Sequence, residues 1–422
     1  MTNYTMDLYE TKREIVNFSK KISKGLKKSD SKFAMDMIYG IFKSGSVLTS
    51  EIARGLEEKV KLNSTITRIC ENLYFLKDKE KNIIKENFKE IIKNKFRETK
   101  EIICNLDDTD IAKEYGKKFE DLCIVRDASS VKEKLVSGYH VCEAVILTET
   151  MKQPISVYSE IYSSESKNFK SKNNYTLESI NEVRKIFPDK NWLFTADRGY
   201  DAGYYYKDMI ENGGDFIVRL KDSRKLLFKG KRRNVMEVAK SRKGKIKMNM
   251  QFSEEEKECY VSYTRVQLPK YPEEELTMVS VYGLSEEEPM ILLTNKMVSE
   301  KDSAIQIARH YMNRWRIEEY FRGKKQEYEF ENMRVRSLRA MNTMNMFLTL
   351  VLGEIVLIIE AMDRKLLCFK IIERSKSLRK KVIVWITQLA RGIIEILKYA
   401  KKGIKEFQNI EVRSKEKQMV LF

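Results

Sequence analysis

The order of apolar segments between residues 100 and 220 constrains the fold more than any other feature of this chain. Runs rich in β-branched and apolar residues predict three strands, at 101–107, 141–147 and 155–158. The pattern then alternates, with a helix at 177–186, a strand at 192–196, a helix at 202–211 and a strand at 215–220. Three strands followed by alternating helix and strand indicate an α/β fold built on a mixed sheet.

The regions on either side of this segment have different residue patterns. Residues 1–95 read as helical, with few glycine or proline breaks. Strand-like runs separated by charged or proline-containing turns predict an antiparallel β insertion, with strands at 245–251, 258–266, 278–283 and 290–294. We therefore expect a helical domain at 1–95, a core at 96–225 and 298–362, the insertion at 226–297, and a basic helical C-terminal region at 363–422.

The chain carries a large excess of positive charge. The 80 Lys and Arg residues outnumber 62 Asp and Glu, for a formal net charge of +18, which favours a polyanionic partner. The six cysteines form no C-x-x-C pair, so the sequence supports neither a zinc module nor a disulfide framework. Only His140 and His310 are present, which leaves little for Ser-His or Cys-His catalysis. Catalysis by carboxylates is therefore the simplest interpretation of this composition.

An apolar run at 344–362 raises the question of a membrane span. Asn345, Glu354 and Glu360 interrupt it, so we expect a buried core helix. The first seven residues lack the basic start and apolar run of a signal peptide. We therefore expect a cytoplasmic protein with no membrane partner.

Residues 311–325 set polar side chains at helical spacing. Successive residues of an α-helix are about 100° apart around its axis. At this spacing, a stripe about 60° wide on one face would contain Tyr311, Arg314, Glu318 and Lys325. Such a face suits a metal ion beside a phosphodiester, with Glu318 on the cation and Arg314 and Lys325 on phosphate oxygens. The alternative is a solvated charged face, on which Arg314 and Glu318 form an ordinary i, i+4 pair.

Two further carboxylates follow apolar strands. Asp107 closes the first predicted strand and is followed at once by Asp108, whereas Asp197 closes the strand at 192–196. Two-metal phosphoryl transfer needs about three carboxylates that converge on cations roughly 4 Å apart. Asp107, Asp197 and Glu318 form such a candidate set, although each Asp taken singly is more often a turn or cap residue than a metal ligand.

These motifs resemble those of insertion-sequence transposases of the DDE superfamily, specifically the insertion-sequence-four type. The resemblance covers roughly residues 100–345 and rests on the D-x-T element at 107–109, the D-R-G-Y-D element at 197–201 and the Y-R-E-K spacing that starts at Tyr311. It implies a ribonuclease-H-like catalytic core that cleaves DNA and joins the freed 3′-hydroxyls to target DNA, with Mg²⁺ as cofactor and Mn²⁺ as a substitute. By the same resemblance the metals are carried by Asp107, Asp197 and Glu318, and DNA phosphates are bound by Tyr311, Arg314 and Lys325.

The resemblance also implies the partners. Double-stranded DNA, both terminal inverted repeats and target DNA, would be bound by a dimer. Asp107 leads the D-x-T element and is our choice over Asp108 as the first ligand. Some relatives hold a flipped base with a Trp in the last strand of the insertion, where this sequence has Met290. The alternatives are a ribonuclease-H-fold nuclease that only hydrolyses, and a catalytically silent DNA-binding protein derived from a transposase, against which the three acids argue.

A pair of short helices near residues 49–69 has the pattern of a helix-turn-helix. Cap residues at Thr49 and Ser50 begin the first helix, and a second starts near Asn63 after a polar break. If this second helix enters a major groove, the residues that would recognise DNA ends are Asn63, Ser64, Thr67 and Arg68. A plain helical hairpin is at least as consistent with the sequence.

Overall fold

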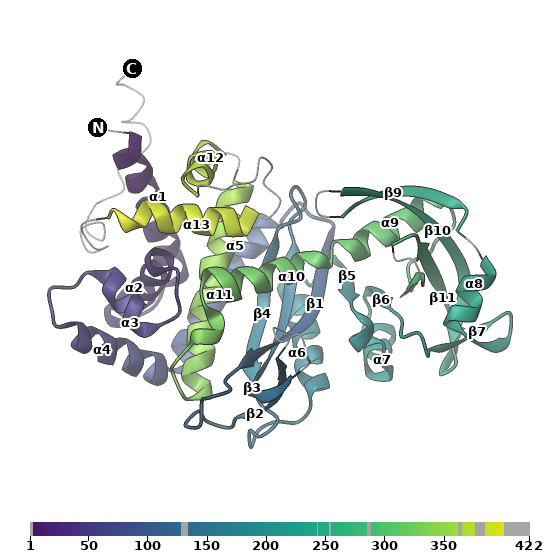
Figure 1. The fold of residues 1–422 in the computed structure, drawn as a ribbon, viewed down its shortest axis with the longest axis horizontal. Coiled ribbons are helices and arrows are strands. Elements are labelled where there is room, and N and C mark those ends of the chain that lie inside the picture. Colours follow the sequence, from purple (N-terminus) through teal and green to yellow (C-terminus); the bar gives the residue numbers. More distant parts are fainter. Residues whose placement is uncertain are drawn as a thin grey trace. The chain divides into compact units, whose positions relative to one another are not determined.

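The computed structural model of the chain describes residues 3–127, 134–242, 244–252, 255–284, 288–361, 365–375 and 385–400. The chain divides into two compact units. The sheet unit comprises residues 93–115 and 121–321, and the helical unit comprises the residues before 93, the segment 116–120 and the residues after 321. Figure 1 shows the elements in sequence colours.

The sheet unit begins with antiparallel strands and continues with parallel ones. Its first strands are β1 (Glu101–Ala112), β2 (Cys123–Asp127), β3 (Lys134–Leu147) and β4 (Pro154–Tyr162). β3 pairs antiparallel with β1 on one edge and with β2 and β4 on the other. The next strands, β5 (Asn191–Ala196) and β6 (Asp215–Arg219), extend the sheet in parallel, with β5 beside β1 and β6 beside β5. The structure therefore confirms the expected α/β class with a mixed sheet.

The strands expected between residues 226 and 297 are present and pair antiparallel. They are β9 (Ile246–Phe252), β10 (Glu255–Leu268), β11 (Tyr271–Tyr282) and β12 (Met290–Thr294), preceded by β7 (Lys225–Phe228), β8 (Lys231–Asn234) and α8 (Val235–Arg242). β12 pairs with β6, so the insertion does not form a sheet of its own. The central sheet instead continues in the order β6-β12-β11-β10.

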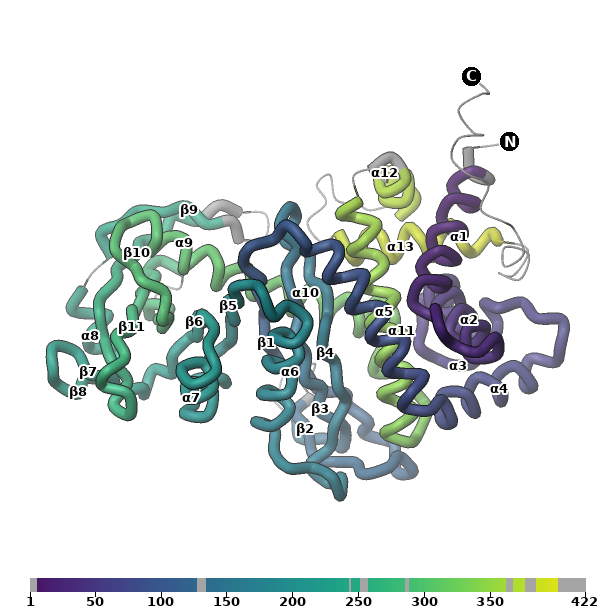
Figure 2. The backbone as a smooth tube through the Cα atoms, turned by 180° about the vertical axis from the view of Figure 1, so that it is seen from behind, coloured from purple at the N-terminus to yellow at the C-terminus, as the bar shows by residue number. Residues whose placement is uncertain are grey.

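Helices cover both faces of this sheet. They are α6 (Lys172–Ile186), α7 (Gly203–Asn212), α9 (Lys301–Met312) and α10 (Trp315–Arg322). α6 contacts β3 and β4, and α9 contacts β5, β6 and the insertion strands β9 to β11. The view from behind shows α6 and α7 in front of the strands, whereas α9 and α10 lie nearer the viewer in Figure 1 (Figures 1 and 2).

The helical unit consists of helices from both ends of the chain. The N-terminal ones are α1 (Asn3–Ile22), α2 (Lys28–Ser44), α3 (Thr49–Leu56), α4 (Leu62–Phe75) and α5 (Asp78–Lys95), of which the last residues of α5 belong to the sheet unit. The C-terminal ones are α11 (Leu338–Glu360), α12 (Lys365–Arg374) and α13 (Trp385–Lys398). α11 packs against α2, α4, α12 and α13. The expected domain at 1–95 therefore shares its core with residues after 321.

α11 is the apolar segment that raised the question of a membrane span. It is long and apolar enough to cross a membrane, but 83% of its apolar window is buried inside the protein. Gly353 lets α5 approach closely, because a Cβ there would lie 2.5 Å from Cζ of Phe88. α11 is thus a core helix, as expected. Much of the basic C-terminal region, including Lys376 to Lys381 and Lys401 to Lys405, lies outside the described residues.

Candidate catalytic site

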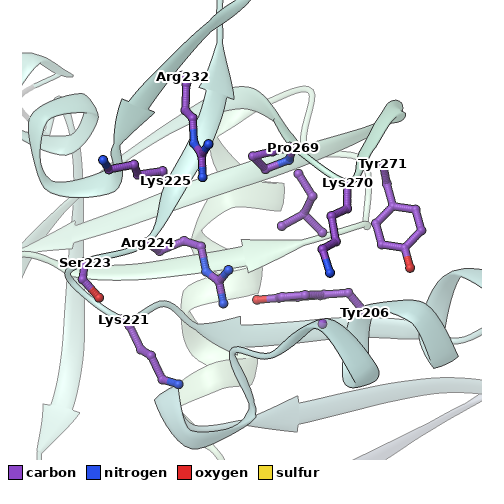
Figure 3. Close-up of a pocket in the computed structure, with 11 residues that line it drawn as sticks. Tyr206, Lys221, Ser223, Arg224, Lys225, Arg232, Pro269, Lys270 and Tyr271 are labelled. Carbon is purple, nitrogen blue, oxygen red and sulfur yellow. The ribbon is translucent and has the colours of Figure 1, made fainter.

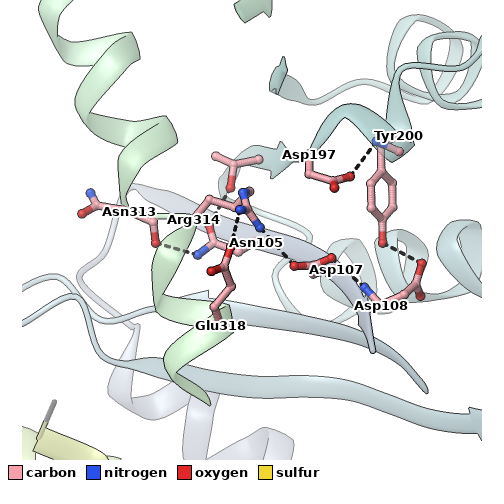
Figure 4. A network of polar contacts seen from close by, with 10 residues as sticks. Asn105, Asp107, Asp108, Asp197, Tyr200, Asn313, Arg314 and Glu318 are labelled. Carbon is pink, nitrogen blue, oxygen red and sulfur yellow. Dashed lines mark hydrogen bonds and ion pairs between the residues drawn. The ribbon is translucent and has the colours of Figure 1, made fainter. Parts of the chain in front are cut away.

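The register of two parallel strands brings Asp107 and Asp197 side by side. Leu106 on β1 pairs with Ala196, the last residue of β5, so the next residues are Asp107 on β1 and Asp197 just beyond the end of β5. Neighbouring strands lie about 4.8 Å apart. Residues that are 90 positions apart in the sequence therefore present their carboxylates at the same level of the sheet (Figure 4).

The segment with the Y-R-E-K spacing is not one continuous helix. α9 ends at Met312 and α10 begins at Trp315. At the break, the amide of Arg314 donates to the carbonyl of Tyr311 at 2.9 Å, and the amide of Ile317 donates to that of Arg314 at 3.0 Å. These i to i−3 bonds are tighter than α-helical ones. The prediction of a single polar stripe on one helix face is therefore wrong.

Asn105 holds this break against the sheet. Its side-chain amide donates to the backbone carbonyl of Asn313 at 3.0 Å, and its carbonyl oxygen accepts from the Thr195 hydroxyl at 2.6 Å. Asn105 and Thr195 are both fully buried. This pair was not predicted from the sequence, although a polar Asn inside the otherwise apolar run 102–106 was a signal for it. The two residues link β1, β5 and the start of α10.

Arg314 joins two of the predicted acids. Its guanidinium donates to the Asp107 carboxylate at 3.0 Å and to the Glu318 carboxylate at 2.5 Å (Figure 4). The Arg314 side chain is only 15% exposed, whereas the Glu318 side chain is 40% exposed, so the Arg314 end of this pair is withdrawn from solvent. Burial lowers the pKa of Arg314, but the facing Tyr311 and the two carboxylates raise it above its ordinary value.

Asp107 lies in an environment that disfavours its charged form. Burial raises the pKa of its carboxyl to about 7. Arg314 opposes this shift, and the nearby negative charge of Asp197 adds to it. One Asp107 oxygen accepts from the backbone amide of Asp108 at 2.9 Å. A cation placed between Asp107 and Asp197 would relieve the repulsion between them.

Asp108 points to the opposite face of the sheet, as strand alternation requires. Its carboxylate lies 2.9 Å from the ammonium of Lys172 at the start of α6, and it accepts from the Tyr200 hydroxyl at 3.2 Å. Asp107 and Asp108 therefore have separate surroundings, and only Asp107 contacts Arg314 in the described residues.

The two outer residues of the Y-R-E-K spacing have other surroundings. Tyr311 is 6% exposed and packs in the core of the sheet unit together with Met290. The Arg314 guanidinium lies over the Tyr311 ring, 5.9 Å from its centroid. Lys325 belongs to the helical unit, in a π-helical turn at Gly323–Glu327, and forms an ion pair with Glu331 at 2.9 Å.

The expected DNA-reading residues lie on α4. Asn63, Ser64 and Thr67 are exposed. Arg68 is instead engaged within the helical unit, because its guanidinium lies 3.0 Å from the Asp36 carboxylate and 2.8 Å from that of Glu58. α3 and α4 contact each other, and both predicted helices are present.

The donor chemistry at the candidate site suits a hard cation. The adjacent carboxylates of Asp107 and Asp197 offer the oxygen ligands that Mg²⁺ prefers. Across the described ranges, no three His, Cys, Asp or Glu side chains are grouped closely enough to hold a metal ion. The Glu318 carboxylate accepts a hydrogen bond from Arg314.

Comparison with known proteins agrees with this geometry. Residues 134–353, more than half of the chain, match the family described as the transposase DDE domain. The matched range includes Asp197 and Glu318 and begins after Asp107. No curated protein matches the sequence significantly. By this match over most of the sheet unit, the chain belongs to the transposase DDE domain family.

Proposed function

We propose that the protein is a DNA transposase of the insertion-sequence-four type that cleaves the ends of an insertion sequence and joins the freed 3′-hydroxyls to target DNA. The observation that carries this proposal is the convergence of Asp107, Asp197 and the Arg314–Glu318 pair at one place on the sheet. Hydrolysis of a phosphodiester at the element's end leaves a 3′-hydroxyl. This hydroxyl then attacks a phosphodiester of the target strand, and no covalent protein intermediate is needed.

Asp107, Asp197 and Glu318 would hold the divalent cations. When bound, Mg²⁺ or its substitute Mn²⁺ would activate the attacking oxygen and stabilise the leaving oxygen. Asp107 is preferred over Asp108 because it shares a sheet level with Asp197, whereas Asp108 is engaged by Lys172. Asn105 would position the backbone from which Arg314 and Glu318 project.

Arg314 would exchange its partners during the reaction. Its guanidinium binds Asp107 and Glu318, and a DNA phosphate offers it the same planar pattern of acceptors. Binding the phosphate would release Glu318 to join the other two acids. The Tyr311 ring, over which the Arg314 guanidinium lies, would support that guanidinium. Lys325 would contribute a further phosphate contact.

A ribonuclease-H-like core is the fold that we propose for the sheet unit. The support is its element order, in which the four strands β1 to β4, paired antiparallel, precede the helix-linked parallel strands β5 and β6. The bound DNA would comprise terminal inverted repeats and a target duplex, held by a dimer. Asn63, Ser64 and Thr67 on α4 would read the ends, and the ion pairs of Arg68 with Asp36 and Glu58 would orient that helix.

The proposal is tested by a strand-transfer assay. Short inverted repeats in the DNA that flanks the gene supply the labelled end substrate, which is incubated with target duplex and Mg²⁺ or Mn²⁺. We expect labelled ends covalently joined to the target. Cleaved ends that never join would identify a nuclease that only hydrolyses. Bound but uncut ends would identify a catalytically silent DNA-binding protein.

A further inference from the structure

A basic pocket lies in the sheet unit, apart from the acids of the candidate catalytic site. Its volume is about 550 Å³. Five segments line it: the start of α7, the loop after β6, the start of β7, strand β8, and the turn between β10 and β11. The cationic side chains among its lining residues are Lys221, Arg224, Lys225, Arg232 and Lys270, and no lining residue is acidic.

Most of this positive charge has no ion-pair partner among the residues that the structure describes. Of the lining cations, only Arg224 forms an ion pair in the described part of the chain, at 2.6 Å from Asp201. Lys221, Lys225, Arg232 and Lys270 are exposed. Figure 3 shows Arg224, Arg232 and Lys270 directed into the space beside Tyr206. Like charges gathered around a hollow favour an anionic ligand.

The wall of the pocket is held in place by a buried carboxylate. Asp201 is 1% exposed. It accepts from the Tyr206 hydroxyl at 2.7 Å, from the Lys221 amide at 2.9 Å and from Arg224 at 3.0 Å. Because Asp201 fixes the orientation of Arg224 and Tyr206, the pocket is organised before any ligand binds.

The N-terminus of α7 adds to the positive potential. The helix begins at Gly203, a pocket residue, and the preceding Ala202 supplies no side-chain cap. A Cβ at Gly203 would meet only the Lys270 ammonium, at 4.0 Å, so the first turn faces open space. Free amides and the helix dipole at such an end favour phosphate groups.

We propose that this pocket binds phosphates of the DNA backbone next to the candidate catalytic site. The inference rests on the proposed function, in which DNA is the substrate. Asp201 follows Asp197 after the single 3-10 turn at Arg198–Tyr200, so both sites lie beyond the carboxyl ends of β5 and β6. A DNA strand carries one phosphate per about 3.4 Å of helix axis. DNA held at Asp197 therefore has further phosphates for the pocket.

The test compares two double variants of equal charge. Arg232→Ala with Lys270→Ala removes two pocket cations, and Arg233→Ala with Lys240→Ala removes two exposed cations that do not line the pocket. Arg233 is a matched control, because neighbouring residues of a strand point to opposite faces. Binding of a labelled random duplex is measured against salt concentration without divalent cations. Circular dichroism melting checks that all proteins are folded, as expected for exposed substitutions.

For the pocket variant, we expect the slope of log affinity against log salt concentration to be less steep than that of wild type by about two. Each lost phosphate contact lowers the steepness by about one. The control variant should keep the wild-type slope. Equal slopes for the two variants would overturn the inference. A competition with inorganic tripolyphosphate separates the two sources of phosphate: tripolyphosphate that binds in the pocket and is not displaced by duplex DNA would also overturn it.

Failure of this inference is distinguishable from failure of the proposed function. Wild-type protein that joins ends while the pocket and control variants bind alike would leave the function standing and remove the pocket. Wild-type protein that joins no ends but shows a salt slope dependent on Arg232 and Lys270 would support the pocket and contradict the proposed function. The binding measurement requires no catalysis, so the two results are independent.

Discussion

The guanidinium of Arg314 donates to the carboxylate of Asp107 at 3.0 Å, across 207 positions of sequence. This contact ties the break between α9 and α10 to strand β1. The same guanidinium also binds Glu318, so two of the acids proposed as metal ligands share one cation.

Removing any one proposed metal ligand should abolish catalysis but not DNA binding. Asp107→Ala, Asp197→Ala and Glu318→Ala are each expected to lower cleavage by at least about a thousandfold, because each removes several kcal/mol of charge stabilisation from a unit that acts together. The measurement is cleavage of labelled ends in Mg²⁺ and in Mn²⁺, alongside a gel-shift assay. Asp189→Ala, an exposed carboxylate on the turn before β5, is the control. Appreciable cleavage by Glu318→Ala would contradict the assignment.

Asp108→Ala should separate the two adjacent acids. Asp108 faces Lys172 and Tyr200 rather than Asp107's partners, so we expect cleavage to persist. Loss of the acceptor for the buried Tyr200 hydroxyl should lower the free energy of unfolding by about 1–2 kcal/mol. Cleavage assays and urea unfolding measure these effects. An inactive Asp108 variant beside an active Asp107→Ala would reverse our choice of ligand.

Asn105 should act as a positioning residue. Asn105→Leu removes the partner of the Asn313 carbonyl and of the Thr195 hydroxyl, which should cost about 1–3 kcal/mol of unfolding free energy. We expect kcat for end cleavage to fall while the affinity for DNA is kept, because Arg314 and Glu318 lose their support. Asn105→Asp retains an acceptor for the Thr195 hydroxyl but has no amide to donate to the Asn313 carbonyl. We therefore expect its kcat to recover only in part toward the wild-type value. A fall in stability with unchanged kcat would assign Asn105 a purely structural role.

His140 should make stability depend on pH. Its Nδ1 lies 2.7 Å from an Asp110 oxygen, and hydrogen bonds to Asp110 and Cys123 raise the pKa of His140 from 6.5 to about 9. The folded protein therefore binds the proton more tightly than the unfolded chain. The stabilisation is fully present below pH 6.5 and is lost as the pH rises through about 9. Urea unfolding of wild type and His140→Phe from pH 6 to 10 measures it. The difference between the two proteins should shrink over this window, and a difference that is constant with pH would refute the prediction.

Exposed polar residues of α4 should carry the preference for element ends. Asn63→Ala and Thr67→Ala are each expected to lower discrimination between end and random duplex by about 1–3 kcal/mol if their side chains reach base edges. Asn82→Ala, an exposed Asn on α5, is the matched control. Competition binding at fixed salt is the measurement. Single substitutions are needed, because α2 and α4 pack on α11 and removal of residues 1–95 would expose that core. Unchanged selectivity in both α4 variants would move end recognition elsewhere.

Local sequence patterns determined the elements of this protein. The predicted strands 192–196 and 290–294 agree with β5 (Asn191–Ala196) and β12 (Met290–Thr294), because β-branched and apolar runs between turns report burial on a sheet directly. The same patterns identified α11 as a core helix, since its interrupting polar residues indicate protein rather than lipid surroundings. Residue type and spacing also singled out Asp107, Asp197, Glu318 and Arg314 as candidates for the site.

Only the tertiary structure decided how these elements meet. The break between Met312 and Trp315 could not be read from helical spacing, because its geometry depends on a hydrogen bond from Asn105, 208 positions away. The ion pairs of Arg68 and the facing of Asp107 toward Arg314 depend on packing partners and strand register. The basic pocket is lined by cations from separate segments of the chain. The formal net charge of +18 by itself does not say where these cations converge. Contacts between distant residues follow from the arrangement of the whole chain, whereas periodicity describes only neighbours along it.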